Sequence, residues 1–217
     1  MEKDASSLFY QINKLAPHFK HFQIDIADGI FVPNKTVQIE EIKNYSLTPN
    51  RLIPSPSLSF DFHLMVQDYE GEIKKLGKLR NIIKINYVFI HFSVFPNPYP
   101  LVPNRLIPFP IGLVLNPQDQ ISDLTSRYAL KDIPFIQIMS VNPGFQGSPF
   151  IPEVLNKIEQ LRELGFRKEI FLDGAVNEKT IPVIEAQKYR PDFICPGSYL
   201  TKSTELEKRV KYLENYK

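Results

Sequence analysis

The amino-acid sequence predicts an α/β fold in which a parallel sheet closes into a (β/α) barrel. Short apolar runs of six to eight residues recur along the 217 residues. Amphipathic, helix-like stretches lie between them, and no linker-like segment interrupts the alternation. Seven strand candidates without a break favour one closed barrel over a two-domain open sheet. We therefore expect residues 1–217 to form a single domain.

The seven apolar runs are rich in Ile, Val, Phe and Leu, and each ends near a turn-forming or polar residue. Such runs are typical of strands buried on both faces, as in a parallel sheet. The runs are His21–Asp28, Asp61–Val66, Tyr87–Ser93, Ile111–Asn116, Phe135–Asn142, Glu169–Val176 and Phe193–Leu200. In a TIM-type barrel the carboxyl ends of the strands form one mouth, where active sites lie.

Four amphipathic stretches between or beside these runs predict helices, because their apolar residues recur at helical spacing. They are Ser7–Leu15, Ile151–Leu164, Glu178–Ala186 and Ser203–Leu213. Phe95–Pro110 differs, since it contains six prolines. An interior helix does not tolerate them, so we expect an extended loop where a barrel helix would otherwise lie.

Composition excludes several classes of partner. Lys and Arg number 26 against 24 Asp and Glu, which gives no electrostatic basis for nucleic-acid binding. The single cysteine, Cys195, excludes an intramolecular disulfide framework and a cysteine-based zinc site. No apolar run approaches the ~18 residues that a membrane span needs. We expect a cytoplasmic protein with neither nucleic acid nor membrane as a partner.

Four predicted strands carry an ionisable side chain inside the apolar run: Asp25, His63, His91 and Asp173. Burying such a group costs free energy unless something compensates it. A single one is more often a hydrogen-bonded core residue than a ligand, and we interpret His91 in that way. Two aspartates and a histidine that converge at one mouth suit either a divalent cation or an acid–base pair.

Glycine-containing turns follow the last three predicted strands. They are the loop over residues 141–147, the turn at Gly174-Ala175, and Gly197-Ser198. The loops after the last strands of a barrel are its usual phosphate site, where backbone N–H groups point inward. One such turn is weak evidence, but three at one mouth predict a phosphate group on the ligand.

Several segments together resemble the ribulose-phosphate 3-epimerase family. The segment at 25–34, DIADGIFVPN, resembles the family's D-x-x-D-G-x-F-V-P-N stretch, and MSVNPGFQG at 139–147 is the longest match. The further matches are DFHLMV at 61–66, FIPEVL at 150–155, LDGAVN at 172–177 and Gly197-Ser198. They occur in family order from about Asp4 to the C-terminus.

The resemblance implies an isomerase that inverts C3 of a ketopentose phosphate, interconverting D-ribulose 5-phosphate and D-xylulose 5-phosphate. Of Asp25 and Asp173, one removes the C3 proton to give an enediolate, and the other returns a proton to the opposite face. A divalent metal ion (Zn, Fe, Mn, Co or Mg) held by Asp25, His63 and Asp173 would stabilise the enediolate oxygens.

The resemblance also implies the residues around the substrate. Substrate and phosphate contacts fall on His63, Gly144, Phe145, Gln146, Gly147, Gly174, Ala175, Gly197 and Ser198. Met65 and Met139 match sulfur-bearing side chains that line the family's reacting centre, although both also suit a barrel core. Family members commonly form dimers or hexamers, which implies a homo-oligomer here.

The sequence departs from the family at three places. Gln23 stands where the family has a metal-ligating histidine, and a glutamine carbonyl suits Ca²⁺ or Mg²⁺ better than Zn²⁺ or Fe²⁺. Asp4–Leu15 aligns with the segment after the family's first strand, so we expect that strand to be truncated or missing, leaving unpaired edges. Gln146 and Ala175 replace family glycines.

These departures leave three functions open. The first is an active ketopentose-phosphate epimerase. The second is a catalytically silent paralogue that binds a sugar phosphate or a partner protein. The third is an epimerase for another phosphorylated ketose.

Overall fold

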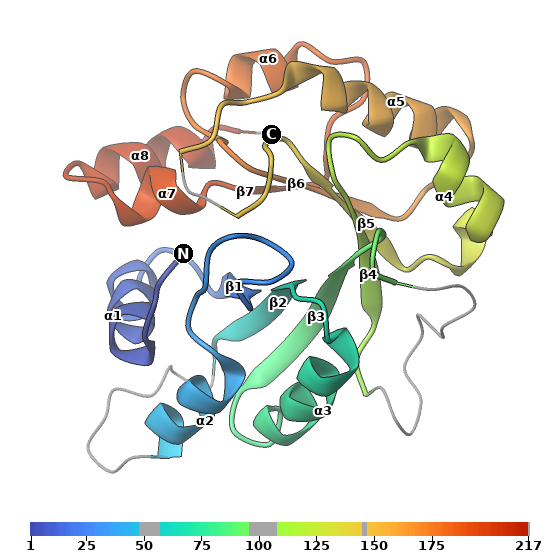
Figure 1. The fold of residues 1–217 in the computed structure, drawn as a ribbon. Helices are drawn as coiled ribbons and strands as arrows, with labels where there is room; N and C mark the ends of the chain where they lie inside the picture. The colour runs from blue at the N-terminus through green and yellow to red at the C-terminus, as the bar shows by residue number, and fades with distance from the viewer. Residues whose placement is uncertain (48–56, 96–107, 145–146, 217) are drawn as a thin grey trace.

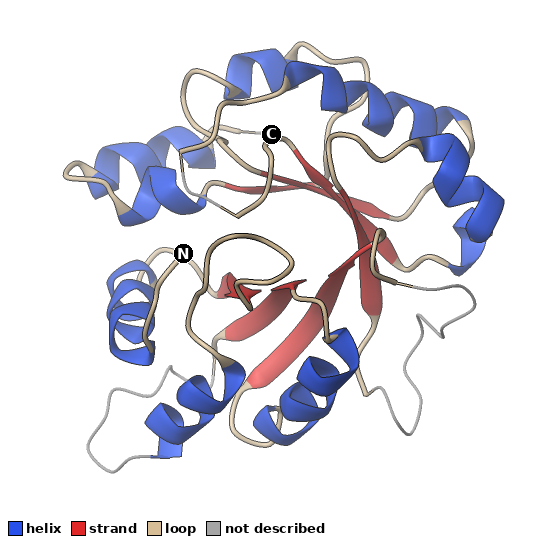
Figure 2. Ribbon diagram, in the orientation of Figure 1, coloured by secondary structure: helices blue, strands red, loops and turns tan. Residues whose placement is uncertain are grey.

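The computed structural model describes residues 1–47, 57–95, 108–144 and 147–216, and in them strand and helix alternate as predicted (Figures 1 and 2). Most of the expected proline-rich loop, together with Phe145 and Gln146, lies outside the described residues.

Seven parallel strands form one sheet, and each pairs with the next along the chain. They are β1 (His21–Ala27), β2 (Ser59–Met65), β3 (Lys84–His91), β4 (Ile111–Leu115), β5 (Phe135–Met139), β6 (Glu169–Asp173) and β7 (Phe193–Cys195). The sheet curls into a nearly closed ring in which β1 and β7 are the two edges (Figure 1). A TIM barrel has eight strands, so the predicted barrel is confirmed with one strand absent from the described residues.

The helices lie outside this ring (Figure 2). They are α1 (Ala5–Leu15), α2 (Ile39–Leu47), α3 (Tyr69–Leu79), α4 (Ile121–Arg127), α5 (Asn156–Glu163), α6 (Ile181–Glu185), α7 (Gly197–Thr201) and α8 (Leu206–Glu214), with 3₁₀ turns at Leu130–Asp132 and Pro152–Leu155. The Asp4 carboxylate accepts a hydrogen bond from the Ser7 N–H and so caps the start of α1. None of the helices in the described ranges is long and apolar enough to cross a membrane.

The last predicted strand is the one that the structure corrects most. The run Phe193–Leu200 is strand only as far as Cys195, and its second half forms α7. Pro196 separates the two elements because proline lacks the N–H that a ladder needs. Tyr199 and Leu200 are apolar because they pack inward from a helix, where each is 7% exposed or less.

The two main apolar clusters of the core lie on opposite faces of the sheet. The larger one fills the space between strands and helices, and the smaller one lies inside the ring around Phe89, Phe135 and Phe171. The Phe89 ring centroid lies 5.0 Å from those of Phe135 and Phe171, in edge-to-face contacts. Phe171 lies two residues before Asp173 on the same strand, so this aromatic cluster forms the floor beneath the barrel mouth.

The free edge of β1 is hydrogen-bonded at its upper end by a loop residue instead of a strand. The Thr36 hydroxyl accepts from the Ala27 N–H at 2.9 Å and donates to the Asp25 carbonyl at 2.8 Å, and the Thr36 N–H donates to the Ala27 carbonyl at 3.1 Å. Three backbone groups that a missing strand would pair are therefore satisfied.

Below Thr36, the edges of β1 and β7 bound a cavity of about 660 Å³. Helices α1 and α8 contribute to its walls, so it occupies the place of a further strand. Much of its lining is apolar and includes Leu8, Ile12, Phe22, Phe193, Ile194 and Leu213.

Two glycine substitutions should have opposite effects on the free energy of unfolding. A Cβ added to Gly112 on β4 would lie 2.0 Å from two ring carbons of Phe135, whereas one added to Gly77 in α3 meets nothing within 4 Å. We expect Gly112→Ala to lower the free energy of unfolding by about 1–3 kcal/mol through overpacking. Gly77→Ala, the control, should raise it by up to about 1 kcal/mol through helix propensity. Urea unfolding measures both, and a neutral Gly112→Ala would contradict the close packing of Phe135.

Candidate active site

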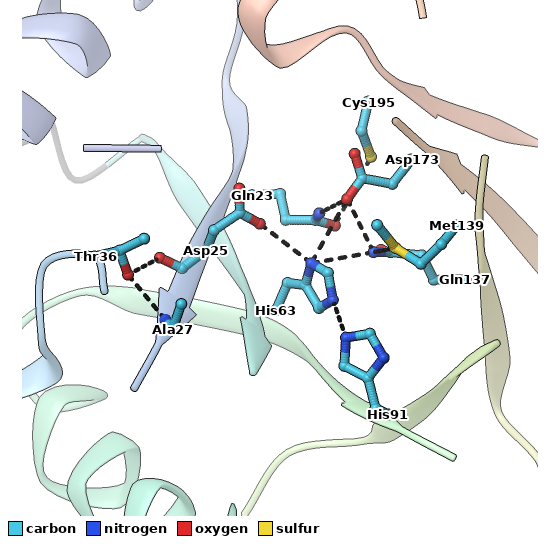
Figure 3. Close-up of polar contacts among 10 residues, drawn as sticks. All are labelled: Gln23, Asp25, Ala27, Thr36, His63, His91, Gln137, Met139, Asp173 and Cys195. Atoms are coloured by element: carbon cyan, nitrogen blue, oxygen red, sulfur yellow. Dashed lines mark hydrogen bonds and ion pairs between the residues drawn. The ribbon is translucent and has the colours of Figure 1, made fainter. Parts of the chain in front are cut away.

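Asp25, His63 and Asp173 meet at the barrel mouth, as the sequence predicted (Figure 3). Asp25 is near the carboxyl end of β1 and pairs in register with His63 on β2, while Asp173 ends β6. The His63 Nδ1 atom lies 3.2 Å from Asp25 Oδ1 and 3.6 Å from Asp173 Oδ2. One imidazole therefore stands between two carboxylates.

Burial and mutual charge shift the protonation of this cluster. The His63 side chain is 1% exposed, and those of Asp25 and Asp173 are 28% and 19% exposed. Burial alone would lower the pKa of His63, but hydrogen bonds and attraction from Asp173 and Asp25 outweigh it and raise the pKa to about 9. Burial raises the pKa of Asp173, and the negative charge of Asp25 adds to the rise, while His63 opposes it.

His91 on β3 is the hydrogen-bonded core histidine that the sequence predicted, and its partner is the site histidine. It is fully buried, and its Nε2 lies 2.9 Å from His63 Nε2. Burial, and then the charge of His63, hold the pKa of His91 well below its ordinary value. A neutral His91 thus accepts the His63 Nε2–H, which directs Nδ1 of His63 toward the carboxylates.

Gln23 reaches the cluster from β1, one inward position below Asp25. Its Nε2 donates to Asp173 Oδ2 at 3.2 Å, and its Oε1 accepts from the Cys195 thiol at 3.8 Å. Burial raises the pKa of that thiol well above its ordinary value, and nearby carboxylates add to the rise, so it remains a proton donor. Gln23 is therefore part of the site through its amide N–H.

Gln137 is a site residue that the sequence analysis missed. It lies in the middle of β5, fully buried, with its Nε2 3.2 Å from Asp173 Oδ2 and 3.4 Å from His63 Nδ1 (Figure 3). The signal was present, since Gln137 is a polar residue inside the apolar run FIQIM, on the same strand face as Met139.

The cluster fits a divalent cation in its chemistry and its spacing. Ligand atoms of Asp25, His63 and Asp173 all lie within 4.8 Å of one another, and within the described residues this is the one such group of histidine, cysteine and carboxylate ligands. Two carboxylate oxygens and one imidazole nitrogen are donors that Mg²⁺, Mn²⁺, Fe²⁺ and Zn²⁺ accept.

A second cavity, of about 90 Å³, opens directly above the cluster. It lies next to the larger cavity, since Asp25, Asp173, Cys195 and Gly197 line both. The described positions that the resemblance implied for substrate surround it: His63, Met65, Met139, Gly144, Gly147, Gly174, Ala175, Gly197 and Ser198. The structure thus gathers at one mouth residues that come from separate segments of the chain.

The turn after β6 is held in an unusual backbone conformation. Gly174 has φ +115°, and a Cβ there would lie 2.6 Å from a methyl group of Val141. Ala175 has φ +49° and is the one residue other than glycine with positive φ in the described chain. Alanine adopts this left-handed region at a cost of order 1 kcal/mol, and such strain is concentrated at functional sites.

Comparison with known proteins identifies the family of the chain. The sequence model of the ribulose-phosphate 3 epimerase family matches residues 3–200. The chain belongs to this family. Membership places it among the epimerases and confirms the resemblance of the motifs.

The family's curated members include several similar proteins, each named ribulose-phosphate 3-epimerase. That of Helicobacter pylori is 31% identical over 202 residues, covering 88% of this chain and 84% of its own. That of Synechocystis is 34% identical over 170 residues, covering 75% and 69%. That of Methanocaldococcus jannaschii is 28% identical over 199 residues, covering 88% and 77%.

The raised pKa of His63 predicts a loss of stability in alkali for the metal-free protein. The folded-state pKa of about 9 lies above the ordinary value of 6.5. Protonated His63 therefore contributes its full stabilisation below about pH 6.5 and loses it as the pH rises through about 9. The advantage of the wild type over His63→Gln in unfolding free energy should shrink by about 1.4 kcal/mol per unit between pH 7 and pH 9, and level off above that. Urea titrations in EDTA measure it, and a constant advantage would contradict the ion pairs.

Proposed function

We propose that the protein inverts C3 of a ketopentose phosphate, interconverting D-ribulose 5-phosphate and D-xylulose 5-phosphate. The observation that carries the proposal is the pair of carboxylates, Asp25 and Asp173, on either side of one buried imidazole. Inversion needs one group to remove a proton and another to deliver one, and two carboxyls in different protonation states do both. Family membership supplies the reaction class.

The surroundings of the two carboxyls support different roles at the start of a turnover. Burial and the charge of Asp25 raise the pKa of Asp173, so Asp173 retains a proton more readily and acts as the acid. Asp25, more exposed and beside His63, acts as the base that takes the proton from C3. In the reverse direction the two exchange roles.

Asp25, His63 and Asp173 are the residues that would hold a divalent metal ion. When bound, the ion supplies Lewis-acid stabilisation of negative charge that develops on the substrate oxygens. His91 orients His63 for this purpose by accepting its Nε2–H. Met65 and Met139, which are 2% and 4% exposed, exclude water from the reacting carbon.

The phosphate group of the substrate would bind at the glycine turns. Gly197 and Ser198 are the first residues of α7, where N–H groups have no acceptor within the helix. Gly174 and Ala175 lie in the strained turn after β6. Gly144 and Gly147, both with positive φ, lie in the loop after β5.

Proton exchange at C3 tests the proposal directly. We expect D-ribulose 5-phosphate in D₂O to exchange its C3 proton with the protein and a divalent metal, as followed by NMR. Asp25→Asn should slow this exchange by about 10²–10⁴-fold, the contribution of a general acid or base, and Asp173→Asn should slow the inversion to D-xylulose 5-phosphate by a similar factor. Asp123→Asn on the exposed face of α4 is the matched control.

The outcomes separate the three functions that the sequence left open. Exchange that Asp25→Asn loses, together with inversion that both site variants lose and the control retains, supports the proposed epimerase. Exchange with a ketohexose phosphate but not with the pentose would favour the third. No exchange with either, under any metal, in a folded protein would leave the catalytically silent binding protein.

Substitution of Gln23 tests whether the metal site is weakened at this position. Replacing its amide by an imidazole adds a nitrogen ligand that Zn²⁺ and Fe²⁺ prefer, so Gln23→His should raise both the metal retained after dialysis and the turnover. Metal content is measured by mass spectrometry. Gln38→His is the control, because the Gln38 amide bonds the carbonyls of Ala27 and Thr36, away from the cluster. Equal metal content in wild type and Gln23→His would mean that the site is not weakened at this position.

A further inference from the structure

Gln137 places an amide against the two groups that a cation at this site must contact. Its Nε2 lies 3.2 Å from Asp173 Oδ2, 3.4 Å from His63 Nδ1 and 3.6 Å from Met139 Sδ. The side chain is fully buried and projects from β5 toward the cluster (Figure 3). An apolar residue would fill the same space without the cost of burying an amide.

The amide of Gln137 is only half satisfied. Its Oε1 is buried and has no hydrogen-bond partner among the described residues. Leaving a buried acceptor unpaired costs about 1–3 kcal/mol. A cation in the cluster would give Oε1 a partner once the amide is turned toward it, since amide oxygens are good ligands of hard divalent ions.

Gln23 and Gln137 differ in whether the amide oxygen has a hydrogen-bond partner. Both amides donate to Asp173 Oδ2 at 3.2 Å. The oxygen of Gln23 already accepts from the Cys195 thiol, whereas the oxygen of Gln137 accepts from nothing described. Of the two glutamines, Gln137 is therefore the one whose side-chain oxygen is available to a cation.

The spacing around Gln137 also suits a ligand. Adjacent ligands of an octahedral ion with bonds of about 2.1 Å are about 3.0 Å apart, and opposite ligands about 4.2 Å. The amide position lies 3.2 and 3.4 Å from Asp173 Oδ2 and His63 Nδ1, and Asp25 Oδ1 lies 3.2 Å from the same imidazole nitrogen. A half-turn about the Cγ–Cδ bond exchanges Oε1 and Nε2 and leaves the rest of the side chain in place.

We infer that Gln137 is a ligand of the divalent cation through Oε1, and that it, rather than Gln23, supplies the neutral oxygen of the site. This inference rests on the metal of the proposed function and adds a ligand to Asp25, His63 and Asp173. Three oxygens and one imidazole nitrogen form a donor set that favours Mg²⁺ or Mn²⁺ over Zn²⁺.

Binding of Mn²⁺, measured by electron paramagnetic resonance and calorimetry on the whole protein without substrate, tests the inference. We expect Gln137→Leu to weaken Mn²⁺ binding at least about tenfold, because it removes a ligand as well as a donor to Asp173. Gln137→Glu, which keeps an oxygen at this position, should bind as tightly as wild type or more tightly. Gln23→Leu is the matched comparison, because it removes the same kind of donor to Asp173 Oδ2 and no ligand; it should weaken binding clearly less than Gln137→Leu does.

The outcomes distinguish failure of Gln137 as a ligand from failure of the proposed metal site as a whole. Gln137→Leu that binds Mn²⁺ within threefold of wild type, while Asp25→Asn loses binding, would overturn the inference and leave the proposed metal site standing. Equal weakening by Gln23→Leu and Gln137→Leu would also overturn it, since both would then act through Asp173. Wild-type protein that binds no Mn²⁺ would overturn the metal and the inference together. Thermal unfolding of each variant confirms that it is folded.

Discussion

Two carboxylates lie close together in the interior of a barrel, and the rest of the site is shaped by the need to compensate their charge. Asp25 and Asp173 cannot both remain ionised in a poorly solvated space unless positive charge or strong donors are near. His63 supplies the positive charge in the metal-free protein, and its pKa of about 9 measures how strongly the two carboxylates hold it. His91 is kept neutral by burial and by that charge, and the amides of Gln23 and Gln137 donate to Asp173. A divalent cation would take over this compensation.

The parallel register of the strands gives this arrangement its precision. Asp25 pairs with His63 across β1 and β2, and Asp173 pairs with Met139 on one side and Cys195 on the other. Phe171, two residues before Asp173 on β6, belongs to the aromatic cluster with Phe89 and Phe135. The groups proposed for chemistry come from strands, which hold them rigidly, while those proposed for the phosphate come from the turns after the strands.

The sequence predicts a site residue best where a strongly polar side chain interrupts an apolar run. An ionised side chain inside an apolar run is unfavourable enough that Asp25, His63 and Asp173 could be identified as a site from the sequence alone. Gln137 violates the same pattern more weakly, because a neutral amide is a common core residue once it is hydrogen-bonded. The end of β7 could not be placed, since Tyr199 and Leu200 are as apolar in a buried helix as in a strand. The side-chain oxygen of Gln23 has a partner because Cys195, 172 residues later in the chain, lies beside it. A local sequence pattern cannot show a contact between residues so far apart.

Thr36 determines how the free edge of the barrel is held. Its hydroxyl and N–H bind the backbone at Asp25 and Ala27, and β2 pairs with the other edge of β1, so the upper half of β1 is hydrogen-bonded on both sides. The position of Asp25 beside His63 therefore does not require a strand between β1 and β7. The contacts of Gln23 with Asp173 and Cys195 span the opening between the two edges of the sheet. At the level of the site, the ring is thus closed by side chains where a complete barrel would have a backbone ladder.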